Sequence, residues 1–115
     1  MWMTLAKMVL ALALLASSAF LHADAQQPAS HTVTVTVKNH RFQPAQIHAP
    51  ANRPIQIRIK NLDPSRMEFE SDTLHVEKVI GANGEGVVEI KPQAPGRYEF
   101  YDDFNQQSTG VLVVR

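Results

Sequence analysis

Apolar and polar residues alternate along much of the chain, with the two-residue period of a β-strand that buries one face. The valines at 33, 35 and 37 share one face of the segment His31–Lys38, and the isoleucines at 55, 57 and 59 do the same in Pro54–Lys60. Shorter segments of this character follow at 67–70, 74–77, 86–90, 97–101 and 109–115. No segment has a clear helical period with caps. The pattern therefore predicts an all-β protein.

Turn-forming residues separate these segments, at Asn39-His40, Asn61–Pro64, Gly81–Gly84 and Pro95-Gly96. About seven to eight short strands at a spacing of roughly 8–12 residues are typical of an antiparallel β-sandwich or barrel. Besides the valine and isoleucine faces, we predict that six further side chains contribute to the core: Phe42, Ile47, Phe69, Val88, Tyr98 and Phe100.

The first 25 residues have the character of a secretory signal peptide rather than of a folded element. Lys7 precedes an apolar run, and Ala23-Asp24-Ala25 has the small-x-small form of a cleavage site. The alternative is an uncleaved membrane anchor, but the run of about 14 apolar residues is shorter than the roughly 20 that span a bilayer. We expect cleavage before Gln26, a polar leader over 26–30, a domain over 31–115, and a periplasmic product without membrane insertion.

Composition excludes several classes of function. Lys plus Arg and Asp plus Glu both number 11, so the chain lacks the basic excess of a protein that binds nucleic acid by bulk charge. It contains no cysteine, which excludes disulfides, thiolate zinc sites, a cysteine nucleophile and the usual blue-copper centre. No nucleophile lies in a Gly-x-Ser-x-Gly context. We therefore expect no catalytic residues, and a binding protein rather than an enzyme.

Three groups of polar residues are candidates for chemistry. Glu68 and Glu70 share one face of their strand, where they are either a solvated outer face or a pair of hard oxygen ligands. His75 and Glu77 likewise share a face, where they are either an ordinary surface pair or ligands of a divalent metal.

The third group is Asp102-Asp103, which directly follows the aromatic strand 98–101. Adjacent carboxylates at a strand end repel each other, and a bound cation relieves that repulsion. The structural alternative is an ordinary turn, where aspartate is frequent.

The order of these segments resembles the cupredoxin-like domain of the EfeO type, which also occurs as a small stand-alone periplasmic protein encoded with ferrous-iron permease systems of the FtrABCD kind. The resemblance covers about residues 32–115. It rests on segments 42–47, 54–61, 67–71, 74–80, 95–104 and 109–114, of which Glu-Phe-Glu and Tyr-Asp-Asp-Phe are the more specific.

The resemblance implies a Greek-key β-sandwich with a metal site at one end. It places Glu68 where blue-copper proteins have their first histidine, Asp102 near the position of their cysteine, and Asn105 where many relatives have histidine. It also implies a role in ferrous-iron uptake, with a ferrous-iron permease complex or another periplasmic iron-uptake component as partner.

The leading hypothesis is a periplasmic metal-binding protein that holds iron or copper. Its candidate ligands are Glu68, Glu70, Asp102 and Asp103, with His75 and Glu77 as a second group. It would act by binding and delivering the metal or by copper-dependent electron transfer. The alternative is a metal-free β-sandwich that binds a periplasmic or membrane partner protein. A copper chaperone ranks lower, because such proteins commonly use several Met or His ligands.

Overall fold

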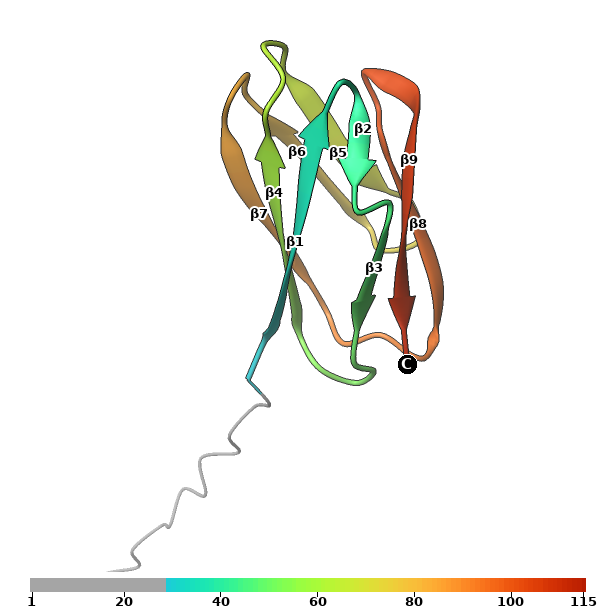
Figure 1. Cartoon of the computed structure of the whole chain (residues 1–115). Helices are drawn as coiled ribbons and strands as arrows, with labels where there is room; N and C mark the ends of the chain where they lie inside the picture. The colour runs from blue at the N-terminus through green and yellow to red at the C-terminus, as the bar shows by residue number, and fades with distance from the viewer. Residues whose placement is uncertain (1–28) are drawn as a thin grey trace, which may run out of the picture.

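We describe the protein from a computed structural model that places residues 29–115; the predicted signal peptide lies outside the described residues. Every regular element of this part is a β-strand (Figure 1). The strands are β1 (His31–Lys38), β2 (Arg41–Gln43), β3 (Gln46–Ala49), β4 (Ile55–Asn61), β5 (Met67–Ser71), β6 (Val76–Ile80), β7 (Glu85–Ile90), β8 (Gly96–Asp102) and β9 (Asn105–Val114). The described residues contain no helix of the length and apolarity needed to cross a membrane.

The strands form two sheets packed face to face, which confirms the predicted β-sandwich. One sheet has the order β2-β1-β4-β7 and the other β3-β9-β8-β5-β6. Both are mixed, because β1 pairs in parallel with β4 and β3 pairs in parallel with β9. The sequence pattern predicted antiparallel pairing throughout. Alternation reports only which face of a strand is buried, so it does not distinguish parallel from antiparallel neighbours.

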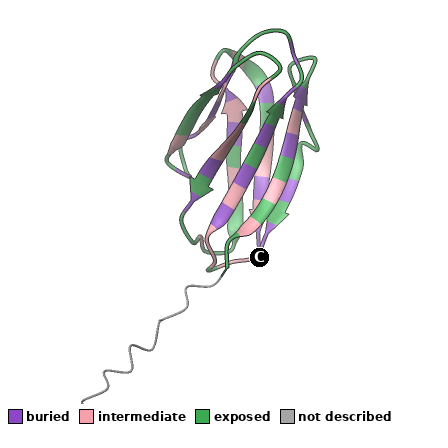
Figure 2. Cartoon of the chain, turned by 90° about the vertical axis from the view of Figure 1, so that its left-hand side faces the viewer, coloured by how far each residue is buried: buried purple, intermediate pink, exposed green. Residues whose placement is uncertain are grey.

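The core lies between the sheets and is built from the alternating positions (Figure 2). The isoleucines at 55, 57 and 59 of β4 are fully buried, as are Phe69 and Phe100 on the facing sheet. Five of the six further predicted core residues are buried, and Tyr98 is partly buried against them. Met67 belongs to the same core, so this thioether is not available to a surface metal site.

Several strand boundaries differ from the sequence prediction, and β9 begins at Asn105, four residues before the predicted segment 109–115. Short strands β2 and β3 form around Phe42 and Ile47, where the chain passes from one sheet to the other. Leu74 and His75 lie in a turn before β6, not in a strand, and His75 has a φ of 56°. These segments are too short for alternation to show a period.

Candidate metal-binding site

Three of the predicted ligands meet on the outer face of the five-stranded sheet. Glu68 and Glu70 lie on β5, and Asp103 lies in the turn between β8 and β9. One carboxylate oxygen from each lies within 4.8 Å of the other two. All three side chains are half-buried. The arrangement offers a cation three hard oxygen donors at one point of the surface.

The pairing of β5 with β8 brings these residues together. Phe69 is opposite Asp102 and Glu70 is opposite Tyr101 in the antiparallel register. The backbone N–H of Asp103 donates to the carbonyl of Glu68 over 2.9 Å, which extends this pairing into the turn. Gln106 Nε2 donates to Asp103 Oδ1 over 3.1 Å and orients that carboxylate.

The crowding of negative charge raises the pKa of Glu70 above its usual value of 4.5. The largest cause is desolvation of the carboxyl group, followed by the charges of Asp103 and Glu68. Glu77, directly opposite Glu70 on β6, adds a smaller repulsion. A bound cation removes this repulsion, so metal and proton compete for the group.

Tyr101 links this group to a fourth carboxylate that the sequence did not indicate. Its hydroxyl donates to Asp72 Oδ1 over 3.2 Å. Desolvation, followed by the charges of Asp72 and Glu70, raises the pKa of Tyr101 to about 12. The tyrosine therefore stays protonated at neutral pH and acts as a hydrogen-bond donor beside the carboxylates. The sequence could not indicate that Tyr101 contacts Asp72, because contacts between strands depend on their register.

Asp102 differs from its neighbour Asp103 in both direction and surroundings. Asp102 is the last residue of β8, its side chain is only 1% exposed, and it is not among the three clustered carboxylates. Its Oδ1 accepts hydrogen bonds from the backbone N–H groups of Glu68 and Phe104, each over 3.0 Å. Asp102 therefore fixes the β8–β9 turn, whereas Asp103, in the turn itself, joins the clustered carboxylates on the outer face.

The predicted ligands His75 and Glu77 lie near Glu70 but do not join the cluster of Glu68, Glu70 and Asp103. Both side chains line a surface hollow of about 390 Å³ together with Glu70 and Asp72. Within the described residues, however, neither belongs to a group of at least three close metal-ligand atoms. His75 and Glu77 thus lie near the three clustered carboxylates, but their side chains are not part of the group whose ligand atoms lie within 4.8 Å of one another.

Two buried polar residues, which the sequence analysis treated only as a turn signal, organise the loops at this end of the sandwich. Asn61 donates from Nδ2 to the carbonyls of Ser65 and Gly81 over 2.8 and 3.0 Å. Asp63 accepts from the backbone N–H groups of Asn39 and His40 over 2.7 and 2.9 Å. The Asn-x-Asp-Pro motif after an apolar strand is the signal that could have identified them.

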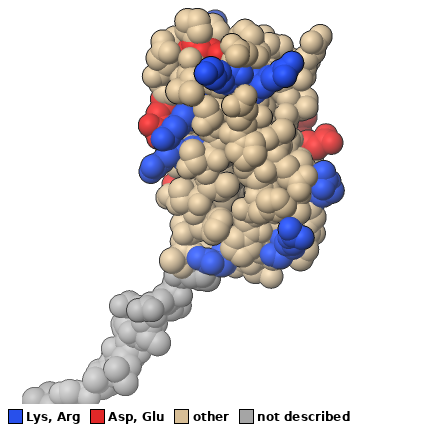
Figure 3. Space-filling model, viewed as in Figure 1, with Lys and Arg blue, Asp and Glu red and all other residues tan. Residues whose placement is uncertain are grey.

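Charge is unequally distributed between the two outer faces, although the chain is neutral overall. The sheet of β1, β2, β4 and β7 presents exposed Lys38, Arg41, Arg58 and Lys60 against exposed Glu85 and Glu89, and Figure 3 shows both basic and acidic side chains on this side of the molecule. The opposite sheet carries the three clustered carboxylates together with exposed Glu77 and Glu99, against exposed Lys78 and Arg97, so its balance is negative. The field of the protein therefore favours approach of a cation to the β5–β8 face.

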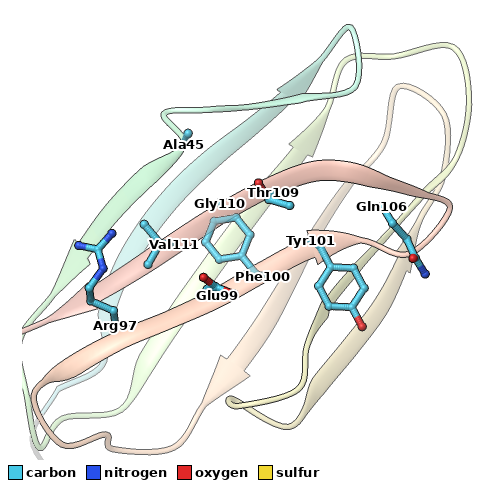
Figure 4. Close-up of a pocket in the computed structure, with 9 residues that line it drawn as sticks. All are labelled: Ala45, Arg97, Glu99, Phe100, Tyr101, Gln106, Thr109, Gly110 and Val111. Carbon is cyan, nitrogen blue, oxygen red and sulfur yellow. The ribbon is translucent and has the colours of Figure 1, made fainter.

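A further hollow of about 550 Å³ lies along β8 and β9, next to the clustered carboxylates (Figure 4). Its lining includes Arg97, Glu99 and Tyr101 from β8, and Thr109 and Val111 from β9. Arg97 and Glu99 are exposed, and the hollow contains no fully buried polar side chain. It is a shallow feature of the sheet surface rather than an enclosed site.

Comparison with known proteins places this sandwich in a family. Residues 8–114 match the family described as the cupredoxin-like domain. The chain belongs to the cupredoxin-like family. An uncharacterized protein of Rickettsia prowazekii (strain Madrid E) is 35% identical over 83 residues, a match that covers 71% of this chain and 66% of that protein. The chain therefore spans just under two thirds of the length of this relative.

Solved structures with the same fold include proteins named for copper. The metal-binding domain of the Streptococcus pneumoniae D39 Cu(I)-exporting ATPase CopA, with Cu(I), has a TM-score of 0.69 and 22% identity, covering 77% of this chain and 89% of that one. Auracyanin A, a "blue" copper protein from Chloroflexus aurantiacus, has a TM-score of 0.64 and 14% identity, covering 76% and 100%. At these identities the likeness concerns the fold.

The side chains of this cupredoxin-like protein do not fit a thiolate copper centre. The sequence has no cysteine, Asp102 is engaged in backbone hydrogen bonds, and Met67 is buried in the core. The clustered carboxylates Glu68, Glu70 and Asp103 instead fit a hard or borderline cation. Carboxylate oxygens suit iron, Mn(II) or Cu(II) better than Cu(I), which prefers sulfur ligands.

Proposed function

We propose that this cupredoxin-like protein binds an iron or Cu(II) ion through Glu68, Glu70 and Asp103. The observation that carries the proposal is the convergence of these three carboxylates within 4.8 Å on one sheet face. The raised pKa of Glu70 supports it, because the repulsion that raises the pKa is relieved by a bound cation. Copper is favoured by the names of the similar structures, and iron by the hardness of the donors.

We propose further that the protein works in the periplasm and delivers its metal to a ferrous-iron permease complex or another iron-uptake component. The leader with its Ala23-Asp24-Ala25 site and the resemblance to the EfeO-type domain support this role. Delivery fits the donor set better than copper-dependent electron transfer does. A carboxylate site stabilises Cu(II) over Cu(I), which hinders rapid exchange of an electron.

Thermal melting of the metal-free protein with Cu(II), Fe(II), Mn(II) or Zn(II) tests the proposal. A cation present at about 100 times its Kd stabilises the native state by about 2.7 kcal/mol. For a domain of this size, that raises the melting temperature by roughly 11–22 °C. We expect this shift with copper or iron, and expect the triple variant Glu68→Gln/Glu70→Gln/Asp103→Asn to lose it.

The double variant Glu85→Gln/Glu89→Gln is the matched control, since these carboxylates lie on β7 of the other sheet. It removes negative charge without touching the proposed site, so its metal-induced shift should equal that of the parent. An equal loss of the shift in both variants would show that only the overall charge matters, and would contradict the proposed site.

The affinity for metal should depend on pH through Glu70. Because its pKa is raised above 4.5, protons displace the metal at a higher pH than an ordinary glutamate would allow, and affinity falls as pH decreases through that range. In the metal-free protein the raised pKa affects folding stability instead of metal affinity. The folded state binds the Glu70 proton more tightly than the unfolded chain does, so the contribution of Glu70 to stability falls as pH rises from 4.5 through its folded pKa. Apparent Kd and melting temperature against pH, in the parent and in Glu70→Gln, measure both trends; a pH-independent affinity would contradict the carboxylate site.

One observation favours a second function, that of a metal-free module that binds a protein partner. Leu62 and Phe104 are 53% and 46% exposed, and both follow strands that end at the same pole of the sandwich. Exposed apolar side chains that adjoin one another in a patch often mark interaction sites, whereas single ones are common on protein surfaces. If no cation shifts the melting temperature, this function becomes the preferred one, and Leu62→Ser/Phe104→Ser is the variant expected to lose the partner.

A further inference from the structure

The outer face of the five-stranded sheet contains apolar side chains that the core does not use. Strand β9 is apolar on both sides near its end: Leu112 and Val114 are buried in the core, and Val111 and Val113 point the other way. Both outward valines are half-buried and, of the described residues, neither is among those that form the core or pack against it. Apolar residues on both sides of a strand are typical of strands that are covered on both faces.

The two outward valines are the centres of two rows that cross β3, β9 and β8. The strand register defines the first row as His48, Val113 and Arg97, and the second as Gln46, Val111 and Glu99. The four polar members are exposed, and Figure 4 shows part of this face beside the hollow of about 550 Å³. Each row therefore has an apolar centre and a charged end on β8, and the two charges are opposite in sign.

The charged ends of the two rows have no ion-pair partner within residues 29–115. The ion pairs of this part of the chain join His40 to Asp63 and Arg58 to Glu85, so they involve neither row. Arg97 and Glu99 stand on the same side of β8, about 7 Å apart along the strand. Both charges are therefore available to groups from outside the molecule.

We propose that this two-row face binds a second copy of the chain in a symmetric dimer. A two-fold axis between the two faces, perpendicular to the strands at the level of Tyr98 and Leu112, places each row over the other row of the second copy. Arg97 of each copy then meets Glu99 of the other, Val111 meets Val113, and His48 meets Gln46. Sheets packed face to face lie about 10 Å apart, a distance that these side chains span from both sides.

Charge complementarity selects both the occupant and its orientation. A two-fold axis along the strands would place each row over the same row of the second copy, so that Arg97 would meet His48 and Glu99 would meet Gln46, without an ion pair. The axis perpendicular to the strands pairs all four charges.

The proposed orientation also keeps the three clustered carboxylates of the two copies apart. These carboxylates lie towards the Asp102 end of β8, beyond the two rows, and the β8 strands of the two copies run in opposite directions. The two negative clusters therefore lie towards opposite ends of the dimer, where their mutual repulsion is weak. The dimer goes beyond the proposed function because its contact uses none of the clustered carboxylates.

Sedimentation velocity of the metal-free protein, in chelator and over about 10 μM to 1 mM, tests the dimer. The parent should pass from monomer to dimer as concentration rises. Arg97→Glu and Glu99→Arg should each weaken self-association about tenfold or more, because each places like charges opposite one another. An equimolar mixture of the two variants should form a heterodimer, since every introduced charge then faces an opposite one.

Lys60→Glu is the matched control: it makes the same change of charge at an exposed position of β4, on the other sheet, and should dimerise as the parent does. Melting temperatures close to that of the parent show that the variants are folded. A parent that stays monomeric at about 1 mM would overturn the proposal and leave this face to a different partner. A dimeric parent whose two variants do not associate on mixing would also overturn it. Because metal is absent, neither outcome depends on the clustered carboxylates.

Discussion

Replacing Asp102 with alanine is expected to destabilise the protein by about 3 kcal/mol, because hydrogen bonds to a charged group contribute about 1.5–3 kcal/mol each. Two backbone N–H groups, those of Glu68 and Phe104, lose their acceptor in a site that is nearly closed to solvent. For a domain of this size, the melting temperature should fall by roughly 12–24 °C. Chemical denaturation and calorimetry of the metal-free protein measure the effect.

Two variants show whether the acceptor or the negative charge is responsible. Asp102→Asn retains an oxygen acceptor for both N–H groups, so it should recover a large part of the stability. Asp103→Ala removes the neighbouring carboxylate, which has a side-chain partner in Gln106 and repels Glu70. We expect this variant to stay within about 0.5 kcal/mol of the parent. Equal destabilisation by Asp102→Ala and Asp103→Ala would contradict the assigned role.

Replacing Gly110 with alanine should have a comparable effect for a different reason. A Cβ atom at this position would lie 2.3 and 2.4 Å from two ring carbons of Phe100 and 3.0 Å from the carbonyl oxygen of Ala45 (Figure 4). Phe100 is fully buried, and its ring centre lies 4.9 Å from that of Phe42 and 5.0 Å from that of Phe69. The ring therefore has little room to move, and we expect a loss of about 3 kcal/mol, at the upper end for overpacked cores.

A second substitution tests whether the clash with the ring is the cause. Phe100→Leu shortens the side chain over Gly110, so the double variant Phe100→Leu/Gly110→Ala should be more stable than the sum of the two single effects predicts. Gly96→Ala is the matched control on the same sheet, because its Cβ would meet nothing closer than 3.5 Å. If the double variant shows simple additivity, the clash is not the source of the loss.

Asp102 and Asp103, at the end of β8, show why not every candidate ligand chosen from the sequence belongs to the clustered carboxylates. Asp102 and Asp103 are chemically identical and adjacent, yet one binds backbone N–H groups inside the turn and the other joins Glu68 and Glu70 outside it. From the sequence alone, the two aspartates form one pair of candidate metal ligands. Their separation follows from the strand pleat together with the exact residue at which β8 ends, and that end point is set by pairing with β5 and β9.

The sequence by itself determined the elements and their buried faces. The valines of β1, the isoleucines of β4 and the shared face of Glu68 and Glu70 all follow from a two-residue period, which is a local property of the backbone. The absence of cysteine also excluded a thiolate centre before any fold was known. Both inferences need only neighbouring residues or composition, so they do not depend on how the strands pair.

Only the tertiary structure decided which side chains meet. The register of β5 against β8 places Asp103 beside Glu68 and Tyr101 opposite Glu70, across 35 and 31 positions of the chain respectively. The β1–β2 turn at His40 is held to the loop after β4 because Asp63 accepts a hydrogen bond from the backbone N–H of His40 over 2.9 Å. Such contacts are selected by packing of the whole sandwich, because a one-residue change of register would turn every side chain to the other face.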